Sequence, residues 1–282
     1  MAEDIAYFFG ACAGRAAAAA GRSAPLLRRR AAVGLLGLAL LSGRSGAQAP
    51  ATVVAASDLQ FALPEVAALF ERHTGHRLRL VFGSSGNFHA QIQQGAPFHL
   101  FLSADESFVF SLADAGRTVD RGRRYARGRI GILVPEGSPL KADGRLHDLA
   151  AALKDGRLKK FAIANPEHAP YGRGAQEALR HAGLWDAIRP RLVFGENVSQ
   201  ALQFAASGAA QGGLIAQSLA LAPAAARLGR FELVPEAWHQ PLLQRMVLLR
   251  DAPAAARAFH DFVASAQAQA VLVRHGFAMP PA

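Results

Sequence analysis

Short apolar segments alternate with amphipathic patterns along the chain from residue 51 onward. Runs such as residues 52–56 (TVVAA) and 161–164 (FAIA) have the length and composition of buried β-strands. Between such runs, apolar residues recur every three or four positions, as at Leu63, Val66 and Phe70, and this spacing predicts a helix. The alternation predicts an α/β fold with largely parallel sheets, in which ligands bind at the carboxyl ends of the strands.

The predicted elements form two successive sets, followed by a returning segment at the end of the chain. The expected strands are residues 52–56, 78–82, 98–102, 130–134, 161–164, 191–194, 213–216, 231–234 and 244–249. We therefore expect two lobes, the first formed by residues 48–128 and 241–282 and the second by residues 129–240. The chain would cross between these lobes twice, near residues 128–131 and near residues 238–241.

The N-terminal region differs from the rest of the chain. Three arginines at residues 28–30 precede an apolar run at residues 31–41, which is the order found in a secretory signal peptide. We expect residues 1–47 to be removed; a membrane anchor is the alternative, but the run is shorter than the roughly 18 to 20 residues that a spanning helix needs. Residues 1–22 have no counterpart in such a signal, which is consistent with a start codon assigned too far upstream. Cys12, the only cysteine, lies there, so the exported protein would lack disulfides and thiolate sites.

The chain after residue 47 is basic, with 25 Lys and Arg residues against 19 Asp and Glu residues, a net charge of about +6. These arginines are scattered, and no stripe of aromatic residues accompanies them, so we expect no nucleic-acid partner. Arg123, Arg124, Arg127 and Arg129 form a denser run. We interpret this run as a solvated face near the first crossing.

Four polar turns follow predicted strands, at residues 56–58, 83–87, 165–172 and 195–198. The turn at residues 83–87 (GSSGN) joins a strand to a helix and contains no lysine or arginine. A helix start presents unpaired N–H groups and the positive end of the helix dipole, so it suits an anion. Ordinary helix capping would explain any one of these turns. Two turns from each lobe together favour an anion site in a cleft.

Hydrolase and metal chemistry have weaker support in the sequence. Residues 83–87 do not form a G-x-S-x-G nucleophile turn, because asparagine stands last, and no phosphate-binding loop or dinucleotide fingerprint is present. Ser85 with His168 as a base is the enzyme alternative. His73 and His76 span a predicted helix end without a carboxylate at ligand spacing, so we expect no metal site.

The four turns and their flanking residues resemble those of the periplasmic molybdate-binding proteins of ABC transporters, in the type II solute-binding superfamily. The resemblance covers roughly residues 52–277. Its markers are AASDL (55–59), FGSSG (82–86), QGAP with LFLSAD (94–105), NPEHAPYG (165–172), ENVSQAL (196–202) and HGF (275–277). It implies the two-lobed type II periplasmic binding protein fold, in which each lobe is a sheet flanked by helices and two hinge crossings join the lobes.

The resemblance also implies which residues hold a tetrahedral oxyanion. Ser57 would supply its hydroxyl and its backbone N–H. Asp58 would contribute its backbone N–H, because a carboxylate that faced the anion would repel it. Ser85 would donate from the second turn. Tyr171 would donate from the second lobe, and Val198 would give its backbone N–H at a helix start.

Two positions depart from the family pattern. Ala216 stands where one branch has a ligand-binding tyrosine, and we expect Tyr171 to replace it. His99 stands where an aspartate is usual, and the sequence gives no reason for it.

The resemblance implies a non-enzymatic, monomeric, periplasmic protein that captures molybdate or tungstate without a cofactor and delivers it to an ABC transporter permease. A site with many donors and few acceptors should reject protonated oxyanions such as phosphate. Sulfate or another oxyanion is the alternative ligand, since selection among unprotonated oxyanions depends on the size of the cavity, which the sequence does not give.

Overall fold

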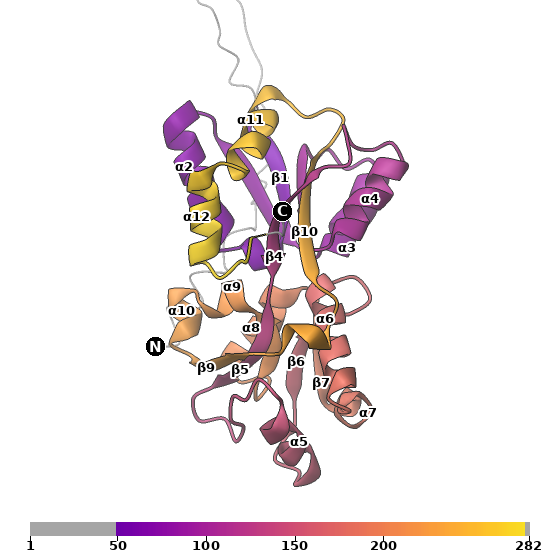
Figure 1. Cartoon of the computed structure of the whole chain (residues 1–282), viewed down its shortest axis with the longest axis vertical. Helices are drawn as coiled ribbons and strands as arrows, with labels where there is room; N and C mark the ends of the chain where they lie inside the picture. The colour runs from indigo at the N-terminus through magenta and orange to yellow at the C-terminus, as the bar shows by residue number, and fades with distance from the viewer. Residues whose placement is uncertain (1–48, 280–282) are drawn as a thin grey trace, which may run out of the picture. The chain divides into compact units, whose positions relative to one another are not determined.

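The computed structural model describes residues 49–279, which contain two five-stranded mixed sheets flanked by helices (Figure 1). The first sheet has the strand order β2-β1-β3-β10-β4, and the second has the order β7-β6-β8-β5-β9. We refer to each sheet with its helices as the first lobe and the second lobe. The expected two-lobed α/β fold is confirmed. The expected signal segment, residues 1–47, lies outside the described residues.

The first lobe combines elements from both ends of the described chain. Its strands are β1 (Ala51–Ala56), β2 (Leu78–Gly83), β3 (Leu100–Ser103), β4 (Arg123–Gly128) and β10 (Leu242–Leu248). Its helices are η1 (Ser57–Leu59), α2 (Ala62–Thr74), α3 (Ser85–Gln93), α4 (Glu106–Asp114), α11 (Ala254–Val263) and α12 (Ala266–Arg274).

The second lobe is formed by the middle of the chain. Its strands are β5 (Ile130–Pro135), β6 (Phe161–Ala164), β7 (Leu192–Gly195), β8 (Gly213–Ala216) and β9 (Gly229–Leu233). Its helices are α5 (His147–Lys154), α6 (Pro170–His181), α7 (Trp185–Ile188), η2 (Arg189–Arg191), α8 (Val198–Ala206), α9 (Gln217–Ala220) and α10 (Pro223–Ala226), and η3 (Glu236–Trp238) follows β9. No helix among residues 49–279 is long and apolar enough to cross a membrane.

The expectation of largely parallel sheets is wrong, because each sheet combines parallel and antiparallel pairs. β1 pairs in parallel with β2 and β3, and β6 with β7 and β8, as expected for strands joined through helices. β10 and β5 instead enter their sheets from the other lobe. Parallel pairing requires a crossover connection within the sheet, and these two strands arrive from the other lobe instead. They run antiparallel to both of their neighbours.

The first sheet is covered by helices on both faces, so its strands are apolar at successive positions. Val53 and Ala55 of β1 face a core that α2, α11 and α12 complete. Val54, between them, faces a second core shared with α3 and α4. Figure 1 shows these two groups of helices on opposite sides of the sheet. Alternation of side chains along a strand explains the division, and burial on both faces explains the continuous apolar run.

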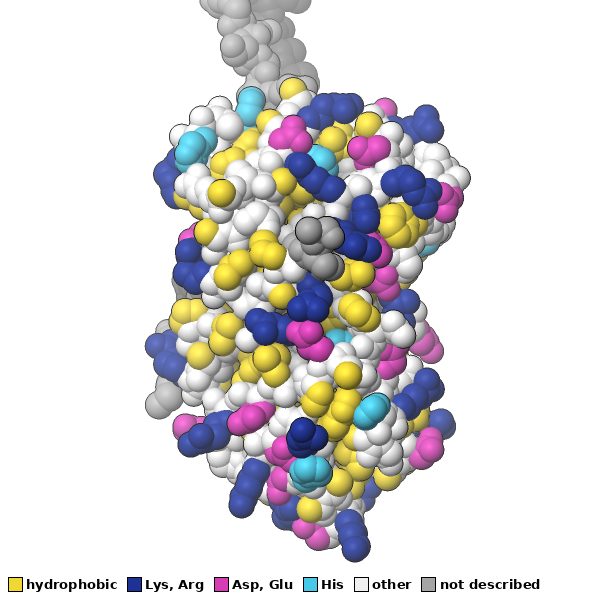
Figure 2. All heavy atoms as spheres, viewed as in Figure 1, with side chains coloured by type: hydrophobic (Ala, Val, Ile, Leu, Met, Phe, Trp, Pro, Cys, Tyr) yellow, Lys and Arg dark blue, Asp and Glu magenta, His cyan; other side chains and the backbone are white. Residues whose placement is uncertain are grey.

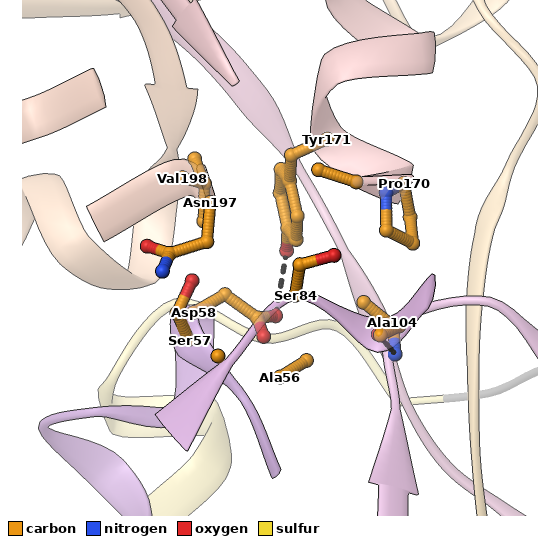
Figure 3. A pocket seen from close by; sticks show the side chains of 12 residues that line it. Ala56, Ser57, Asp58, Ser84, Ala104, Pro170, Tyr171, Asn197 and Val198 are labelled. Carbon is orange, nitrogen blue, oxygen red and sulfur yellow. Dashed lines mark hydrogen bonds between the residues drawn. The ribbon is translucent and has the colours of Figure 1, made fainter. Parts of the chain in front are cut away.

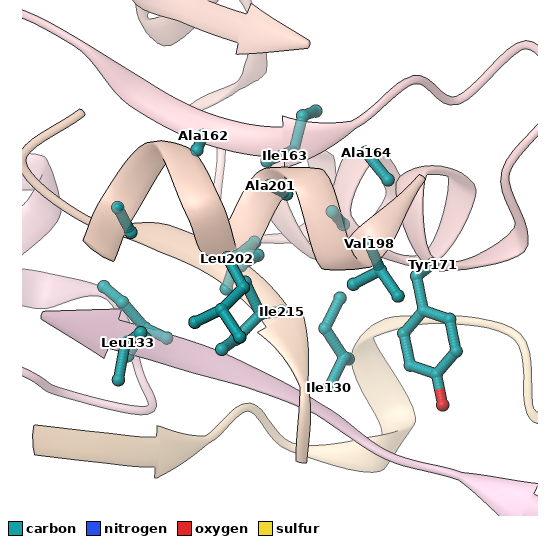
Figure 4. Packing of buried hydrophobic residues seen from close by; sticks show 14 of the residues in the cluster. Ile130, Leu133, Ala162, Ile163, Ala164, Tyr171, Val198, Ala201, Leu202 and Ile215 are labelled. Carbon is teal, nitrogen blue, oxygen red and sulfur yellow. The ribbon is translucent and has the colours of Figure 1, made fainter. Parts of the chain in front are cut away.

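The second sheet packs against α8, whose first turn also reaches the edge of the polar cleft. Figure 4 shows Val198, Ala201 and Leu202 of α8 among apolar residues of β5, β6 and β8. Val198, Ala201 and Ala205 are buried at intervals of three or four residues, which matches the helical repeat. This packing holds the first turn of α8 in a defined position.

The basic run at residues 123–129 was expected to be a solvated face, and this is only partly right. Residues 123–128 form β4, an edge strand of the first sheet, in which Tyr125 and Ala126 are buried. Arg124 and Arg127 point outward and form ion pairs with Glu106 and Glu236. Charged side chains protect such an edge against pairing with other chains. The basic run therefore lies in an edge strand of the first sheet, with its buried residues facing the core.

The chain passes between the lobes at two short segments. β4 ends at Gly128 and β5 begins at Ile130, so Arg129 joins the two sheets. The return runs from the end of β9 at Leu233, through η3, to the start of β10 at Leu242. These two segments are the only covalent links between the sheets within the described residues, and a hinge between the lobes would use them.

His99, the departure without an explanation from the sequence, joins β3 to β1. Its Nδ1 accepts a hydrogen bond from the amide of Thr52 at 2.8 Å, and its own amide donates to the Thr52 carbonyl at 3.0 Å. An aspartate carboxylate could accept from the same amide. His99 is thus a structural acceptor at the start of β3, remote from the polar turns.

Candidate functional site

A small cavity lies where the polar turns of both lobes meet (Figure 3). Its first-lobe residues follow β1, β2 and β3, and its second-lobe residues lie at the starts of α6 and α8. It is lined by Ala56, Ser57, Asp58, Gly83, Ser84, Ser85, Ala104, Ala169, Pro170, Tyr171, Asn197 and Val198. The carboxyl ends of strands thus meet helix starts, which is the expected location for a ligand in an α/β protein.

The turn after β1 is linked directly to the second lobe. Ser57 and Asp58 form η1 and are 4% and 1% exposed. The Ser57 carbonyl accepts a hydrogen bond from the hydroxyl of Ser199 at 2.9 Å, and its Oγ accepts from the Ser199 amide at 3.4 Å. The Asp58 carbonyl accepts from the Ser218 hydroxyl at 2.8 Å. These bonds hold the first polar turn against α8 and α9.

The two serines after β2 have different partners. Ser84 is the N-cap of α3, and its hydroxyl donates to the carbonyl of His168 in the second lobe at 2.8 Å. Ser85 is fully buried, and its Oγ accepts a hydrogen bond from the amide of Ala104 at 3.0 Å. Because that bond uses a lone pair, the Ser85 hydroxyl still has a proton to donate. Ser85 is therefore the better donor to a ligand in the cavity.

Tyr171 and Asp58 meet across the lobes in a buried polar network. The Tyr171 hydroxyl donates to Asp58 Oδ2 at 2.8 Å, and Gln244 Nε2 donates to the same oxygen at 2.5 Å. The Tyr125 hydroxyl donates to Gln244 Oε1 at 2.7 Å. A Cβ at Gly128 would lie 2.2 Å from the Tyr171 oxygen, so this network needs a glycine at the end of β4.

Burial changes the acid–base behaviour of this network. Desolvation raises the pKa of Asp58 to about 6, although hydrogen bonds from Gln244 and Tyr171 act in the opposite direction. Desolvation, with the nearby Asp58 charge as a second cause, raises the pKa of Tyr171 well above its ordinary value. Tyr171 is therefore a neutral hydroxyl at physiological pH.

The start of α8 leaves one amide for a ligand. The Asn197 side chain caps the helix by accepting from the amides of Ser199 and Gln200 at 3.0 and 3.1 Å. Val198, the first helical residue, lines the cavity, and no carbonyl of its own helix is available to its N–H. Its amide also lies at the positive end of the helix dipole, which favours a negative ligand.

Contacts between the lobes surround the cavity. The Gly86 amide donates to the His168 carbonyl at 2.9 Å, and the Asn87 side chain donates to the Glu196 carboxylate. On another side, Arg173 and Asp105 form an ion pair. In this closed arrangement the cavity is shielded from solvent by residues of both lobes.

The cavity is built from neutral donors. No lysine or arginine is among its lining residues, and its ionisable side chains are Asp58 and Tyr171. Figure 2 shows Lys and Arg side chains dispersed over the visible face with Asp and Glu among them. Hydroxyl and amide donors fixed in advance can replace the hydration shell of an oxyanion. The donor set therefore suits a small oxyanion.

All five residues predicted from the sequence line this one cavity. They are Ser57, Asp58, Ser85, Tyr171 and Val198. Their contacts with a ligand stay a prediction. Gln244 was not among the residues predicted from the sequence, although a neutral polar side chain among the apolar residues of the strand LLQRMVL, beside Arg245, is a signal for a buried polar role. It also gave no role to Ser84, which joins the lobes.

The enzyme alternative paired Ser85 with His168, and the structure places them differently. The His168 ring contacts Ser84, with Nδ1 2.9 Å from Oγ, whereas Ser85 bonds to Ala104. The Ser84 proton is directed to the His168 carbonyl. Among residues 49–279, no group of three or more His, Cys, Asp and Glu side chains is arranged to hold a metal ion.

Comparison with known proteins defines the class of this chain. It belongs to the bacterial extracellular solute-binding proteins, a family that matches residues 51–278. The chain is 36% identical to the molybdate-binding protein ModA of Rhodobacter capsulatus over 249 residues, which cover 86% of this chain and 95% of that protein. It is 35% identical to ModA of Azotobacter vinelandii over 248 residues, covering 86% and 95% of the two chains.

The fold matches solved structures of the same kind. The periplasmic molybdate-binding protein of Azotobacter vinelandii superimposes with a TM-score of 0.73 at 29% identity, covering 82% of this chain and all of that one. The sulfate-binding protein SubI of Mycobacterium tuberculosis superimposes with a TM-score of 0.66 at 17% identity, covering 81% and 86% of the two chains. The second match shows a shared fold alone.

Proposed function

We propose that this protein captures molybdate in the cavity between its lobes and delivers it to an ABC importer. The observation that carries the proposal is the cavity itself, which is lined by neutral donors from both lobes and by no lysine or arginine. Relatives that are 35–36% identical over most of the chain are named as molybdate-binding proteins, which supports the same ligand here. Tungstate, a tetrahedral oxyanion of the same charge, would be bound by the same donors.

The proposed ligand contacts are those of the five predicted residues. The hydroxyls of Ser57, Ser85 and Tyr171 and the backbone N–H groups of Ser57, Asp58 and Val198 would surround the oxyanion. Ser85 has a free proton, and Val198 has a free amide at a helix start. Tyr171 would turn its hydroxyl from Asp58 to the ligand or share it between them.

We further propose that the protein acts without catalysis, as a monomer, in the periplasm, with residues 1–47 as its signal peptide. The lobe boundaries would be residues 48–128 with 241–282 and residues 129–240, which the membership of the strands supports. Closure about Arg129 and the return segment would trap the ligand, and the closed form would dock on the permease.

Thermal unfolding of the purified protein with molybdate, tungstate, sulfate or phosphate tests this proposal. A ligand that binds only the folded state raises the melting temperature as its concentration exceeds the Kd. We expect a rise with molybdate and tungstate at micromolar concentrations and little change with phosphate. A rise with sulfate, without one for molybdate or tungstate, would assign the cavity to sulfate instead.

A further inference from the structure

Asp58 is the one carboxyl group that lines the cavity, and its two oxygens have different surroundings. Oδ2 accepts hydrogen bonds from Tyr171 and Gln244. Oδ1 is also buried, and no hydrogen bond of normal geometry reaches it within the described residues; the backbone N–H groups of Asp58 and Leu59 lie near the carboxyl group and act to lower its pKa. Figure 3 shows the Asp58 carboxyl group among the labelled residues of the cavity, with the bond to Tyr171 dashed. An unpaired carboxyl oxygen inside an anion site requires an explanation.

The network around Asp58 determines where a proton would reside. Gln244 Oε1 accepts from Tyr125, so its Nε2 end faces Asp58 and can only donate. Tyr171 also donates to Oδ2. Because Oδ2 already accepts two hydrogen bonds, a proton on the carboxyl group belongs on Oδ1. A protonated Oδ1 is a donor, like every other group that the proposed site offers to an anion.

Within the described residues no ion pair joins Asp58 to a lysine or arginine, and no such charge is among the causes that set its pKa. α8, α9 and β1 carry no ionisable side chain, and Arg79 on β2 is exposed. Two arginines lie close in sequence to Tyr171 and Gln244, which bond to Asp58. Both form ion pairs with other residues, Arg173 with Asp105 and Arg245 with Glu106.

The ionisable groups that face Asp58 itself are the phenols of Tyr171 and Tyr125, both neutral near pH 7. His168 and Glu196 lie further out, where the His168 ring contacts Ser84. An ionised Asp58 would therefore meet a bound dianion without a compensating positive charge, in a site of low dielectric constant.

We propose that Asp58 holds the oxyanion in its protonated form, with the Oδ1 hydroxyl donating a hydrogen bond to the ligand, so that capture takes up one proton. This inference rests on the proposed function and assigns a side-chain role to Asp58 beyond its backbone N–H. The proton comes from solvent when the ligand binds and returns to solvent when the ligand leaves. The burial that raises the pKa of Asp58 to about 6 reduces the cost of this protonation.

The opposite assignment makes Oδ1 an ionised acceptor, which would bind the O–H of a protonated oxyanion such as monohydrogen phosphate. A protonated Oδ1 favours an unprotonated oxyanion, and Asp58→Asn should then keep the affinity for it. An ionised Oδ1 favours a protonated oxyanion, and Asp58→Asn should then abolish its binding. An asparagine side chain can accept from Tyr171 and Gln244 through its oxygen and donate to the ligand through Nδ2. It thus imitates the protonated carboxyl group and cannot imitate the carboxylate.

Isothermal titration calorimetry with molybdate, from pH 5 to pH 8.5, measures the proton directly. At each pH the titration is repeated in two buffers of different ionisation enthalpy, and the difference in heat gives the number of protons taken up. For the unaltered protein we expect uptake close to one proton at pH 8 and close to none at pH 5. The Kd should rise about tenfold per pH unit above pH 6 and level off below it.

Asp58→Asn should remove both effects. Its Kd for molybdate should match that of the unaltered protein near pH 5 and be about 100-fold lower than it at pH 8, with no proton uptake. His168→Gln is the control for the histidine side chain near the cavity, and it should keep both the pH slope and the proton uptake.

Each other outcome overturns the inference in a recognisable way. Molybdate binding that is independent of pH, with no proton taken up by the unaltered protein, would show an ionised or uninvolved Asp58, even if Asp58→Asn failed to fold. Proton uptake that survives in Asp58→Asn would place the proton elsewhere. Phosphate binding that Asp58→Asn abolishes would establish the acceptor role. Absence of molybdate binding at every pH would instead refute the proposed function.

Discussion

The amide of Gly86, at the start of α3 in the first lobe, donates a hydrogen bond to the carbonyl of His168 in the second lobe at 2.9 Å. The two backbones approach so closely that a Cβ at Gly86 would lie 2.5 Å from that carbonyl oxygen. Glycine is required here by the approach of the second lobe and not by its own backbone angles, since its φ is not positive. The contact therefore belongs to the closed arrangement of the lobes.

Gly86→Ala should weaken molybdate binding by about 1 to 3 kcal/mol, the usual cost of overpacking, because the added methyl group obstructs closure. The lobes themselves should remain folded. Calorimetry would measure the loss of affinity, and small-angle X-ray scattering with saturating ligand would show a larger radius of gyration than in the unaltered protein. Gly174→Ala is a matched control, since the nearest atom to its Cβ would be 3.8 Å away. Unchanged affinity in Gly86→Ala would contradict this account of closure.

Ser85→Ala should weaken molybdate binding by about 1 to 3 kcal/mol, because a ligand oxygen that is buried against the missing hydroxyl loses its donor. The Ala104 amide loses its acceptor too, so the melting temperature without ligand should fall slightly. Ser265→Ala, which removes the N-cap of α12 far from the cavity, should lower stability without changing the Kd. Equal affinities for Ser85→Ala and the unaltered protein would exclude Ser85 from the ligand contacts.

Val198→Pro tests a backbone donor that no side-chain truncation can remove. Val198 is the first residue of α8, where proline is well tolerated, and Asn197 before it is extended with φ −151° and ψ 177°, as a residue before proline prefers. The substitution deletes one N–H from the cavity. We expect a loss of about 1 to 3 kcal/mol in molybdate affinity, measured by calorimetry.

Ala266→Pro makes the same change at the first residue of α12, after an extended Ser265. It should leave the affinity unchanged, and because Ala266 is exposed whereas Val198 is buried, it should lower the melting temperature less. If both proline variants bound molybdate as the unaltered protein does, the amide of Val198 would not be a ligand contact.

Local sequence patterns predicted most elements of the fold, and the exceptions have physical reasons. β1 and β6 are short apolar runs buried on both faces, so they are recognisable without tertiary information. β4, with the sequence RRYARG, has the composition of a solvated loop, and only its place beside β10 makes it a strand. The antiparallel course of β5 and β10 depends on which sheet each strand joins. That choice is made by packing between distant segments.

In the candidate site, too, some residues are indicated by their local sequence and others are brought together only by the fold. Ser57, Ser85 and Val198 lie in turns whose sequences indicate helix starts after strands, so they could be found from the chain alone. Gln244 reaches Asp58 from 186 positions away, and only the folded sheet brings them together. The opposed turns themselves gave no indication that the Asp58 carboxyl group would be buried inside the cavity.

The stability of the ligand-free protein should depend on pH through Asp58. Its pKa is about 6 in the folded protein and 3.8 ordinarily, so the folded state binds more protons than the unfolded state between these values. The free energy of unfolding should therefore fall as pH rises from about 4 to 6, by up to about 3 kcal/mol from this group. The contribution is fully present below pH 4 and lost above pH 6.

Asp58→Asn isolates this contribution, because every other ionisable group is common to the two proteins. Glu106, for example, has a pKa lowered by its hydrogen bond from Arg124, so its contribution to the free energy of unfolding rises with pH. That contribution is the same in the variant and in the unaltered protein. Urea unfolding at intervals from pH 4 to pH 8 gives the difference in unfolding free energy between the variant and the unaltered protein. That difference should grow in favour of the variant up to about pH 6 and then stay constant. A difference that does not vary with pH would mean that Asp58 titrates alike in the folded and unfolded chains.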